Sequence, residues 1–585
     1  MDRTAWIAVT LCVIGLVVWQ IYLVKQTPPR PAPVSVTPEQ LSPTASTAPP
    51  TPLTPPAAAP KAAEPVSTFP EKIETLRNSD VELRLTNRGG GIKEVILLRQ
   101  VAEKGEPVVL NSADSAPIGA IVESREIGTP AFPEFTVSRE ANSAVQFERT
   151  TPEQVTIRKK FFFQESPEKK DNFVIEMDVE VQNGGAQPYV DMKGGYFVSL
   201  GSARPIHAKD YPYYTRVVWC IGGKAKGIDV GWFGSSGGFL GLGQRAARSF
   251  YQENIAGAEW VAVSDQFFTT LLAPLTAKAN IVWGRRFDIE GATDQKPSGI
   301  EGALGMPGFE LQPGQPYSAR FEIYAGPKLY HRLAQLPHNE AEIMNFGMLK
   351  LVCQFLLNFM NLLHSWLHDY GLAILALTTI IKLTLWPLQN KANRSMRQMA
   401  ALSPKMQELK EKYKDDPTRM NQEVMKLYKQ YGINPVGGCL PMMIQIPIFF
   451  GLFTMLGQAV ELRNAKFLWV KDLSQPDTLF VIPGMGWVPI LGIPGVGLAV
   501  NILPILMGAT QIWLMAMTPK TGDATQRRVM MFMPLIFLFF CYNFAAALAL
   551  YYTAQNLFSI LQFYQNRNQP MPKLEKVVPA GKRKR

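Results

Sequence analysis

One charged residue stands out in the C-terminal third of the chain, because it lies within an apolar stretch long enough to cross a membrane. Lys382 is the only charged residue between Gly371 and Leu388. A charge near the centre of a membrane span costs roughly 2.5–3.5 kcal/mol on insertion scales, so it usually serves a function. From position alone, a lysine that snorkels towards the lipid headgroups explains Lys382 equally well.

Polar neighbours favour a functional group over a snorkelling one. Thr378 lies one helical turn before Lys382 and shares its helix face. Other apolar stretches carry the polar residues Gln445, Asn501, Gln511, Tyr552, Gln555 and Asn556. Polar side chains on several membrane spans must face one another or water. We therefore predict a hydrated groove with one positive charge, suited to an anionic passenger; plain interhelical hydrogen bonding is the alternative.

Patterns for covalent catalysis or metal binding are weak in this sequence. Gly234–Gly238 matches G-x-S-x-G by letter, but its glycine-rich surroundings predict a loop and not a strand–turn–helix elbow. The five cysteines include no CxxC pair, and neither a P-loop nor an HExxH motif is present. We therefore expect no enzymatic activity, no metal and no cofactor.

The groove residues require membrane spans to position them. Hydrophobic residues make up 47% of the 585 residues and are concentrated in long uncharged runs, which excludes a wholly soluble protein. Spans are predicted at 5–24, 371–388, 441–460 and 496–517. The run 529–565 would be about 55 Å long as one helix, so we expect two spans that turn near Asn543. The prediction is a polytopic α-helical membrane core with six transmembrane helices in all.

The remaining segments are assigned by composition. An uncleaved signal anchor (1–26) precedes a linker (27–68) with 13 prolines, which favours an extended tether. Alternating strand patterns with Gly, Pro and Asn turns predict an antiparallel β-sandwich over 69–340. The partly amphipathic stretch 341–369 is predicted to lie at the membrane surface. The core with five of the spans is placed at 370–568 and a basic tail at 569–585.

Charge gives the orientation. From Thr378 to the C-terminus there are 24 Lys and Arg against 10 Asp and Glu, whereas the rest of the chain has a slight acidic excess. If every span crosses the membrane, the basic loops and the basic tail lie on the same side of it. The positive-inside rule makes that side cytoplasmic. Both termini are then cytoplasmic, and the β-rich domain faces outward.

The basic segment 391–434 is predicted to be a cytoplasmic helical hairpin. Helical spacing of apolar residues is found over Pro404–Tyr413 and again over Met420–Tyr431, with a break at Asp416 and Pro417. Its candidate docking residues are Lys405, Lys410, Lys412, Lys414 and Arg419. Two interpretations fit this pattern equally well. In one, the hairpin docks to ribosomal RNA, a targeting receptor or anionic lipid; in the other, it is a solvated charged surface.

Several motifs resemble one known family. They are "LSPKMQELKEKY" (402–413), "NPVGGCLPMMIQIPIFFGLF" (434–453), "LPILMG" (503–508), "FMPLIF" (532–537) and "LYYTAQNL" (550–557). In this order they are similar to the YidC/Oxa/Alb family of membrane protein insertases. The N-terminal anchor and the large outer domain resemble the Gram-negative form, and "EWVAVSDQFFTTLLAP" (259–274) matches that form more weakly.

The resemblance implies five core helices around a hydrophilic groove that opens to the cytoplasm and to lipid. The family's groove charge is usually arginine, and Lys382 stands at the matching place, so the charge carries over but the bidentate geometry does not. Thr378 and Tyr552 match positions implicated in substrate contact. The apolar slide beside the groove is assigned to Ile446, Phe449 and Met530.

The resemblance also implies a periplasmic all-β supersandwich similar to sugar-mutarotase folds, and a multi-pass location in the bacterial inner membrane. Implied partners are nascent membrane proteins, the Sec translocon, the ribosome, the signal recognition particle receptor and the lipid bilayer. Two other classes stay open from the residues alone. One is a polytopic small-solute transporter, which would need internal repeats. The other is a membrane-anchored carbohydrate-binding protein, which would need paired carboxylates or an aromatic platform.

Overall fold

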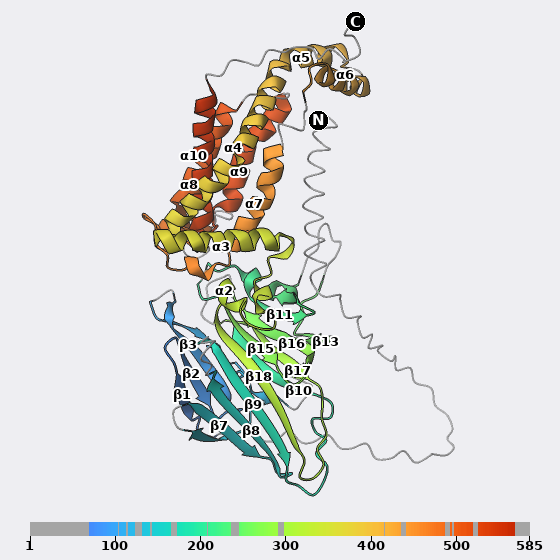
Figure 1. Cartoon of the computed structure of the whole chain (residues 1–585), viewed down its shortest axis with the longest axis vertical. Coiled ribbons are helices and arrows are strands. Elements are labelled where there is room, and N and C mark those ends of the chain that lie inside the picture. The colour runs from blue at the N-terminus through green and yellow to red at the C-terminus, as the bar shows by residue number, and fades with distance from the viewer. Residues whose placement is uncertain are drawn as a thin grey trace, which may run out of the picture.

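The computed structural model describes most of the chain between residues 69 and 567. The described residues are 69–102, 105–112, 115–122, 132–140, 143–164, 172–207, 209–235, 245–289, 298–414, 416–433, 440–485, 492–493, 497–518 and 524–567. The predicted anchor (1–26), linker (27–68) and tail (569–585) lie outside them. Figure 1 shows a β-sheet region at one end of the molecule and a helical region at the other.

Three antiparallel sheets build the β-sheet region. The first has the order β1 (Ile73–Arg77), β2 (Val81–Thr86), β3 (Gly91–Val101), β4 (Pro107–Leu110). The second has the order β13 (Tyr251–Ala258), β16 (Ala279–Asp288), β17 (Ser298–Met306), β10 (Tyr196–Ala203), β5 (Ile121–Val122). The third has the order β12 (Lys224–Asp229), β11 (Arg216–Ile221), β14 (Trp260–Ser264), β15 (Phe268–Pro274), β18 (Pro316–Pro327), β9 (Val174–Asn183), β8 (Val155–Phe163), β7 (Ala144–Thr150), β6 (Thr136–Glu140). The prediction of a mostly β domain is confirmed.

The period-two pattern of the strands explains how the sheets share a core. Along β8, every second side chain from Val155 to Phe161 is buried, and β9 alternates in the same way. Strands β10 and β17 of the second sheet pack on β14 and β15 of the third. Their inward residues belong to one hydrophobic cluster. This follows from the alternation of side chains across a strand, which puts one apolar row on the inner face of each sheet.

One inward position of β8 holds a lysine. The Lys159 ammonium is fully buried and donates to the carbonyl oxygens of Gly89 (2.5 Å) and Gly119 (3.2 Å), and it lies 4.7 Å from the centre of the Phe135 ring. Both glycines have positive φ, +71° and +79°, which lets their carbonyls turn towards the lysine. Burial lowers the pKa of Lys159 to about 7. The lysine therefore ties two turns to the nine-stranded sheet.

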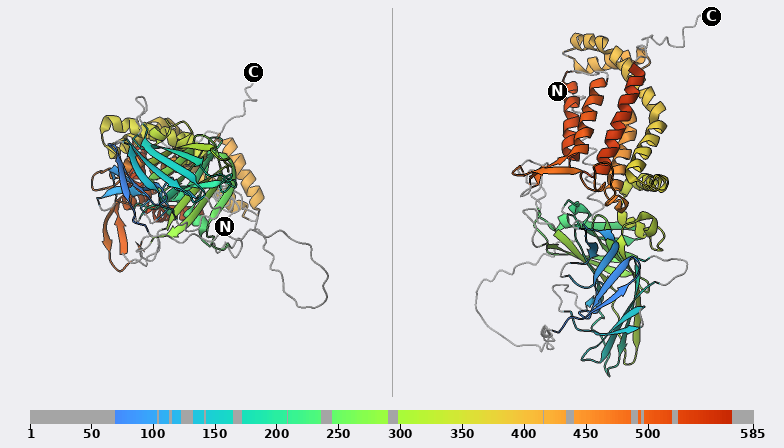
Figure 2. Two further views of the ribbon diagram at one scale, coloured as in Figure 1. Left: turned by 90° about the horizontal axis from the view of Figure 1, so that it is seen from below. Right: turned by 90° about the vertical axis from the view of Figure 1, so that its left-hand side faces the viewer.

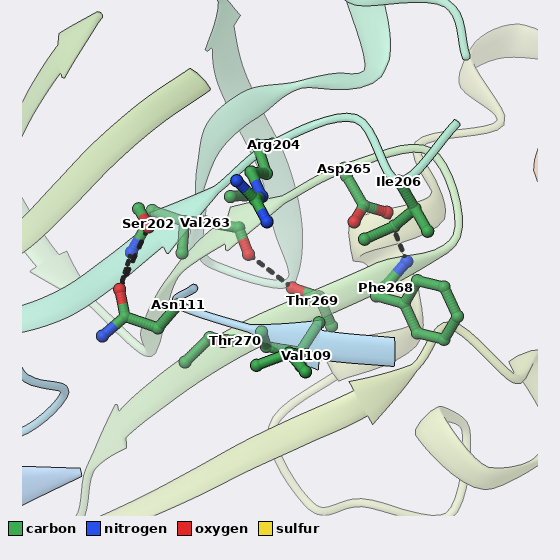
Figure 3. Close-up of a pocket in the computed structure, with 12 residues that line it drawn as sticks. Val109, Asn111, Ser202, Arg204, Ile206, Val263, Asp265, Phe268, Thr269 and Thr270 are labelled. Atoms are coloured by element: carbon green, nitrogen blue, oxygen red, sulfur yellow. Dashed lines mark hydrogen bonds between the residues drawn. The ribbon is translucent and has the colours of Figure 1, made fainter. Parts of the chain in front are cut away.

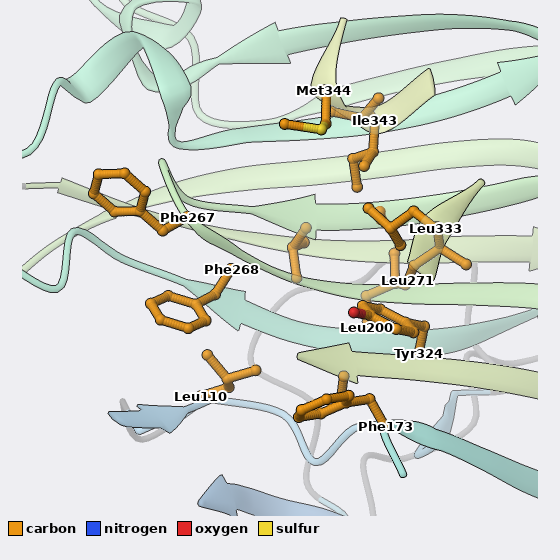
Figure 4. Packing of buried hydrophobic residues seen from close by; sticks show 14 of the residues in the cluster. Leu110, Phe173, Leu200, Phe267, Phe268, Leu271, Tyr324, Leu333, Ile343 and Met344 are labelled. Carbon is orange, nitrogen blue, oxygen red and sulfur yellow. The ribbon is translucent and has the colours of Figure 1, made fainter. Parts of the chain in front are cut away.

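A short segment links the sheets to the helical region and packs against both. It contains α2 (Tyr330–Leu333) and the 3-10 turns η3 (Glu340–Met344) and η4 (Gly347–Leu349). Figure 4 shows Leu333, Ile343 and Met344 from this segment over Leu271 and Tyr324 of the sheet. The segment is thus part of the core of the β-sheet region.

The helical region begins with α3 (Lys350–Leu367), which lies across the ends of the other helices in Figure 1. One side of α3, including Cys353, Leu357 and Met360, is buried against α4 and α7. Another side is apolar but exposed, with Leu351 at 81% and Trp366 at 72% exposure. This helix falls within the predicted surface stretch 341–369.

The remaining helices form a bundle and a projecting hairpin. They are α4 (Tyr370–Ala401), α5 (Ser403–Lys412), α6 (Pro417–Gln430), α7 (Leu440–Leu456), α8 (Ile502–Met517), α9 (Ala524–Cys541) and α10 (Ala546–Arg567). Within the described residues, α4 is the one helix long and apolar enough to cross a membrane by length and composition. Shorter apolar helices cover Met443–Leu456, Ile502–Met517 and Phe532–Cys541. α9 and α10 are separated by a turn that contains Asn543, as predicted.

Two of the predicted helix limits were wrong. Helix α4 does not end near Pro387 but continues to Ala401, so it runs from the apolar stretch into the basic segment. Proline removes one backbone hydrogen bond, and neighbouring helices can compensate for that loss. The span predicted at 496–517 begins only at Ile502, because Gly497–Asn501 forms strand β21, paired with β19 (Thr478–Ile482).

Buried polar contacts hold the β-sheet region against the ends of the helices. The Gln266 side chain donates to the Gly457 carbonyl oxygen (2.7 Å), and the Gln475 side chain donates to Asp210 (2.9 Å). Arg463 donates to the Val101 carbonyl oxygen (3.1 Å), and its guanidinium lies 4.8 Å from the centre of the Phe268 ring. These contacts make the two regions one packed body along this face.

Candidate substrate groove

Lys382 projects from α4 towards α10. Its Nζ donates to the Ser559 hydroxyl at 2.8 Å, and the side chain is half-buried. The Ser559 hydroxyl in turn donates to the Gln555 carbonyl oxygen at 3.0 Å. The positive charge predicted from the sequence therefore lies between two helices of the bundle, next to a polar residue on the partner helix.

The polar stripe of α10 meets polar groups from three other helices. The Gln445 amide on α7 donates to Gln555 (3.0 Å), and Asn556 donates to Thr510 (3.1 Å) and to the Met507 carbonyl oxygen (3.3 Å) on α8. Further towards the α5–α6 end, Gln562 donates to the Asn390 side-chain oxygen at 2.7 Å. Lys382, Gln445, Gln555 and Asn556 are thus brought together along α10.

These side chains largely bond to one another. Gln555, Asn556 and Gln562 are buried. The interhelical bonding that the sequence left as an alternative therefore exists in this arrangement, and Lys382 adds a charge to it. This cluster combines one charge with several hydrogen-bond donors and acceptors. A polar chain that entered the bundle would bond to these groups in place of their present partners.

Thr378 does not extend the polar cluster, whereas Tyr552 hydrogen-bonds with the Gln445 side chain of the cluster. Thr378 is fully buried, and its hydroxyl donates to the Ile374 carbonyl oxygen of its own helix at 2.7 Å. The Tyr552 ring is buried between Phe449 (5.3 Å between ring centres) and Phe537 (5.6 Å). Thr378 is therefore bonded within its own helix, and Tyr552 joins the cluster to an aromatic side.

Asn501 lies elsewhere in the fold, and Gln511 is half-buried on α8. Asn501 precedes α8, where its side chain donates to the Tyr542 carbonyl oxygen (2.9 Å) and accepts from Thr478 (2.7 Å). Its side chain therefore bonds to the turn between α9 and α10 and to strand β19, at the opposite end of the bundle from the α5–α6 hairpin. Grouping Asn501 with Lys382 was wrong, because spacing along a helix cannot reveal that β21 ends there.

The predicted apolar slide has two described members. Ile446 on α7 is about half exposed, and Phe449, one turn later, packs against Phe537 and Tyr552. The Met530 side chain lies outside the described residues. Exposed apolar side chains continue this surface on α9: Phe532, Met533, Leu535, Ile536 and Phe540.

The predicted docking residues all lie on or beside the α5–α6 hairpin. Lys405, Lys412, Lys414 and Arg419 are exposed, and Lys410 is half-buried. Several engage tyrosines: Lys405 bonds to the Tyr431 hydroxyl, and the Arg419 guanidinium lies 5.6 Å from the centre of the Tyr413 ring. The hairpin presents a cationic surface stiffened by aromatic contacts.

Two of the cavities in the β-sheet region are lined by acids and therefore bear on the carbohydrate alternative. The one shown in Figure 3, lined by Asn111, Ser202 and Asp265 among others, holds about 10 Å³, roughly one water molecule. The other holds about 230 Å³ between the first two sheets. Its acids are ion-paired: Glu71 with Lys93 (2.7 Å) and Glu301 with Arg285 (2.7 Å). Carboxylates held this way are not a free acid–base pair.

Sequence reasoning missed two residues of the cluster. Thr510 and Asn390 bind the α10 stripe from α8 and α4. Asn390 follows Lys382 by eight residues, so it lies broadly on the same helix face and was detectable by spacing. Thr510 was detectable only as an isolated polar residue beside Gln511 in an apolar helix.

Known proteins match nearly the whole chain in sequence. Residues 74–359 match the family model of the YidC periplasmic domain, and residues 362–573 match that of the 60Kd inner membrane protein. The membrane protein insertase YidC of Syntrophus aciditrophicus (strain SB) is 31% identical over 607 aligned residues, which cover 97% of this chain and 100% of that protein. The chain belongs to the YidC family of membrane protein insertases. This confirms the resemblance seen in the motifs.

Other YidC proteins are similar over shorter stretches. The YidC of Syntrophobacter fumaroxidans (strain DSM 10017 / MPOB) is 30% identical over 462 residues, 76% of this chain and 74% of that protein. A crystal structure of an active YidC insertase with its first transmembrane domain resolved covers 87% of this chain and 96% of its own, with 18% identity and a TM-score of 0.34. In YidC terms, the mostly β region is the periplasmic domain, and the helical C-terminal region follows it.

Proposed function

We propose that this YidC-family chain inserts and folds integral membrane proteins through a positively charged groove that opens to the cytoplasm and to lipid. It does so with or without the Sec translocon. The observation that carries the proposal is the Lys382 ammonium, which bonds to Ser559 on α10, the helix whose other polar side chains bond to α4, α7 and α8. A single cation beside hydrogen-bonding amides suits the short, often acidic, polar tail of a membrane protein.

The orientation we propose has the α5–α6 hairpin in the cytoplasm and the β-sheet domain in the periplasm of a bacterial inner membrane. These two parts lie at opposite ends of the helical bundle (Figure 1). The excess of Lys and Arg lies in the hairpin, in the α8–α9 loop and in the tail, which favours the cytoplasm for all three. Six spans, counting the N-terminal anchor, a supersandwich periplasmic domain and an interfacial α3 complete this arrangement.

The proposed mechanism is physical and not covalent. A passenger's polar tail enters from the cytoplasm and exchanges hydrogen bonds with Gln445, Gln555 and Asn556 while Lys382 attracts its charge. Its apolar segment moves along Ile446 and Phe449, and along Met530, into lipid. Burial of apolar surface drives the step, and the membrane potential assists acidic tails outward.

The α5–α6 hairpin is the proposed docking site for the cytoplasmic partners. Its exposed Lys405, Lys412, Lys414 and Arg419 form a cationic surface that fits ribosomal RNA, an acidic surface of the signal recognition particle receptor, or anionic lipid. Lys410 supports this surface from a half-buried position. Nascent membrane proteins and the Sec translocon would then meet the chain at the bundle itself.

Insertion by the purified protein tests the proposal. Proteoliposomes that contain only this chain are given a small two-span client, and insertion is scored by protease protection against protein-free vesicles. We expect the wild type and Lys382→Arg to insert the client, because both keep the charge, and Lys382→Met to insert much less. Folded wild-type protein that inserts no more client than protein-free vesicles would contradict the proposal.

A further inference from the structure

A small three-stranded sheet interrupts the chain between α7 and α8. Its order is β19 (Thr478–Ile482), β21 (Gly497–Asn501), β20 (Gly492–Ile493), all antiparallel. We call Thr478–Met485 together with Gly497–Asn501 the outer hairpin. In the right-hand view of Figure 2 it projects sideways, where the bundle meets the β-sheet domain.

The strand β19 is apolar but uncovered. Leu479 and Phe480 are 58% and 53% exposed, and Val481, Ile482 and Met485 are also exposed. Adjacent residues of a strand point to opposite faces, so both faces of β19 are open. A flat, apolar edge strand in water is an aggregation site, and an apolar patch of this kind normally has a partner.

The base of the outer hairpin is fixed to the bundle. The Thr478 hydroxyl donates to Asn501 (2.7 Å), and the Tyr542 hydroxyl donates to the Ala499 carbonyl oxygen (2.7 Å). Next to it, Asp477 accepts the Leu503 backbone N–H at 2.7 Å, which anchors the first turn of α8. The hairpin is therefore held at the depth of the periplasmic end of α8.

The chemistry at this depth favours lipid as the partner. From Thr478 to Thr518 the sequence has no charged residue, so neither the hairpin nor α8 carries a charged side chain. Helix α3 lies at the same level on the opposite side of the bundle (Figure 2), and its Leu351, Phe355 and Trp366 are exposed. Two apolar surfaces at one level on opposite sides match a bilayer plane and not a single protein partner.

We propose that the outer hairpin rests in the periplasmic leaflet as a lipid contact opposite α3. This inference rests on the membrane placement proposed above. The edge of β19 that pairs with no strand among the described residues keeps the hairpin at the headgroup boundary, because unpaired backbone groups are not tolerated in hydrocarbon. With α3 on the other side, the hairpin fixes the tilt of the bundle and of the periplasmic domain packed on it.

Accessibility of a spin label tests the inference. A nitroxide is attached at Phe480→Cys in the full chain, in nanodiscs, on a background in which Cys12, Cys220, Cys353, Cys439 and Cys541 are replaced and insertion activity is retained. Two matched exposed positions serve as controls: Phe540→Cys on α9 for lipid, and Leu275→Cys beyond β15 for water. Frequent collisions of the nitroxide with oxygen indicate that the label lies in lipid. Frequent collisions with a soluble nickel complex indicate that it lies in water.

We expect the label at position 480 to behave like that at 540, with oxygen collisions high and nickel collisions lost, while 275 shows the reverse. If the nickel complex reaches the label at position 480 while the label at position 540 lies in lipid, the hairpin inference is wrong and the insertase proposal still stands. Position 480 shielded from both probes would mean that a second copy covers it, which also overturns the inference. Position 540 in water would overturn the membrane placement and this inference with it.

Discussion

Glu340 carries a buried carboxyl group whose neutralisation we expect to stabilise the protein at alkaline pH. It lies in η3, in the segment that joins the periplasmic domain to α3, and is fully buried. One carboxyl oxygen accepts the His338 backbone N–H at 2.9 Å, and the other has no hydrogen-bond partner among the described residues. Burial raises its pKa from the ordinary 4.5 to about 7, and the nearby Glu322 and Glu259 add to the rise.

The sign of the pH dependence follows from this pKa. The unfolded chain loses the Glu340 proton near pH 4.5 and the folded chain near pH 7, so stability falls as the pH rises through that window. One pKa unit corresponds to about 1.4 kcal/mol. The charged carboxylate therefore costs up to about 3 kcal/mol at pH 8 and under about 1 kcal/mol at pH 5.

Glu340→Gln should accordingly raise the melting temperature of the full chain in detergent at pH 8, with a much smaller effect at pH 5. Thermal unfolding followed by circular dichroism in the β-sheet band measures this. Glu342→Gln is the matched control, because it lies on the same turn but removes an ion pair with Lys350 and should not stabilise. A Glu340→Gln melting temperature that is unchanged at pH 8, or raised equally at both pH values, would refute the reasoning.

Two further substitutions test the packing around the candidate groove. Thr378→Val should keep insertion within about twofold of the wild type, since a buried hydroxyl bonded to its own helix contributes only about 1 kcal/mol. Insertion is measured with the same protease-protection assay. A loss of insertion as large as that of Lys382→Met would show that Thr378 contacts the substrate directly. Gly371→Val should lower the thermal stability of the full chain by about 1–3 kcal/mol, because an added Cβ would overlap the Phe467 ring. Leu372→Ala, exposed on the same turn, is its control, and equal melting temperatures for the two variants would contradict the close approach of the Phe467 ring to Gly371.

Local patterns in the sequence predicted much of the fold. Period-two alternation marked β2, β9 and β18, and helical spacing marked α5, α6 and α10, because both periods follow directly from backbone geometry. The glycines at 89–91 marked the turn between β2 and β3. Asn543 was recognised as a turn because one helix through it would exceed the thickness of a membrane.

Other features depend on contacts that no local pattern contains. Gly497–Asn501 has the composition of a membrane helix and becomes a strand only because β19 pairs with it. Pro387 lies inside α4, because the bundle outweighs the local preference to end the helix. The same applies to the site: helical spacing put Thr378 on the helix face of Lys382, but it could not show that Thr378 bonds within its own helix or that Asn501 lies at the outer hairpin.

The most direct test of the account crosses the Lys382 charge with the charge of the passenger. Two forms of a two-span client, one with an acidic tail and one with the same carboxylates replaced by amides, are offered to proteoliposomes that contain wild type, Lys382→Met or Lys391→Met. Lys391 is the matched control, an exposed lysine nine residues further along α4. We predict that Lys382→Met loses insertion of the acidic client alone, while Lys391→Met inserts both. Equal insertion of the two clients by Lys382→Met would contradict a groove that draws its passengers by charge.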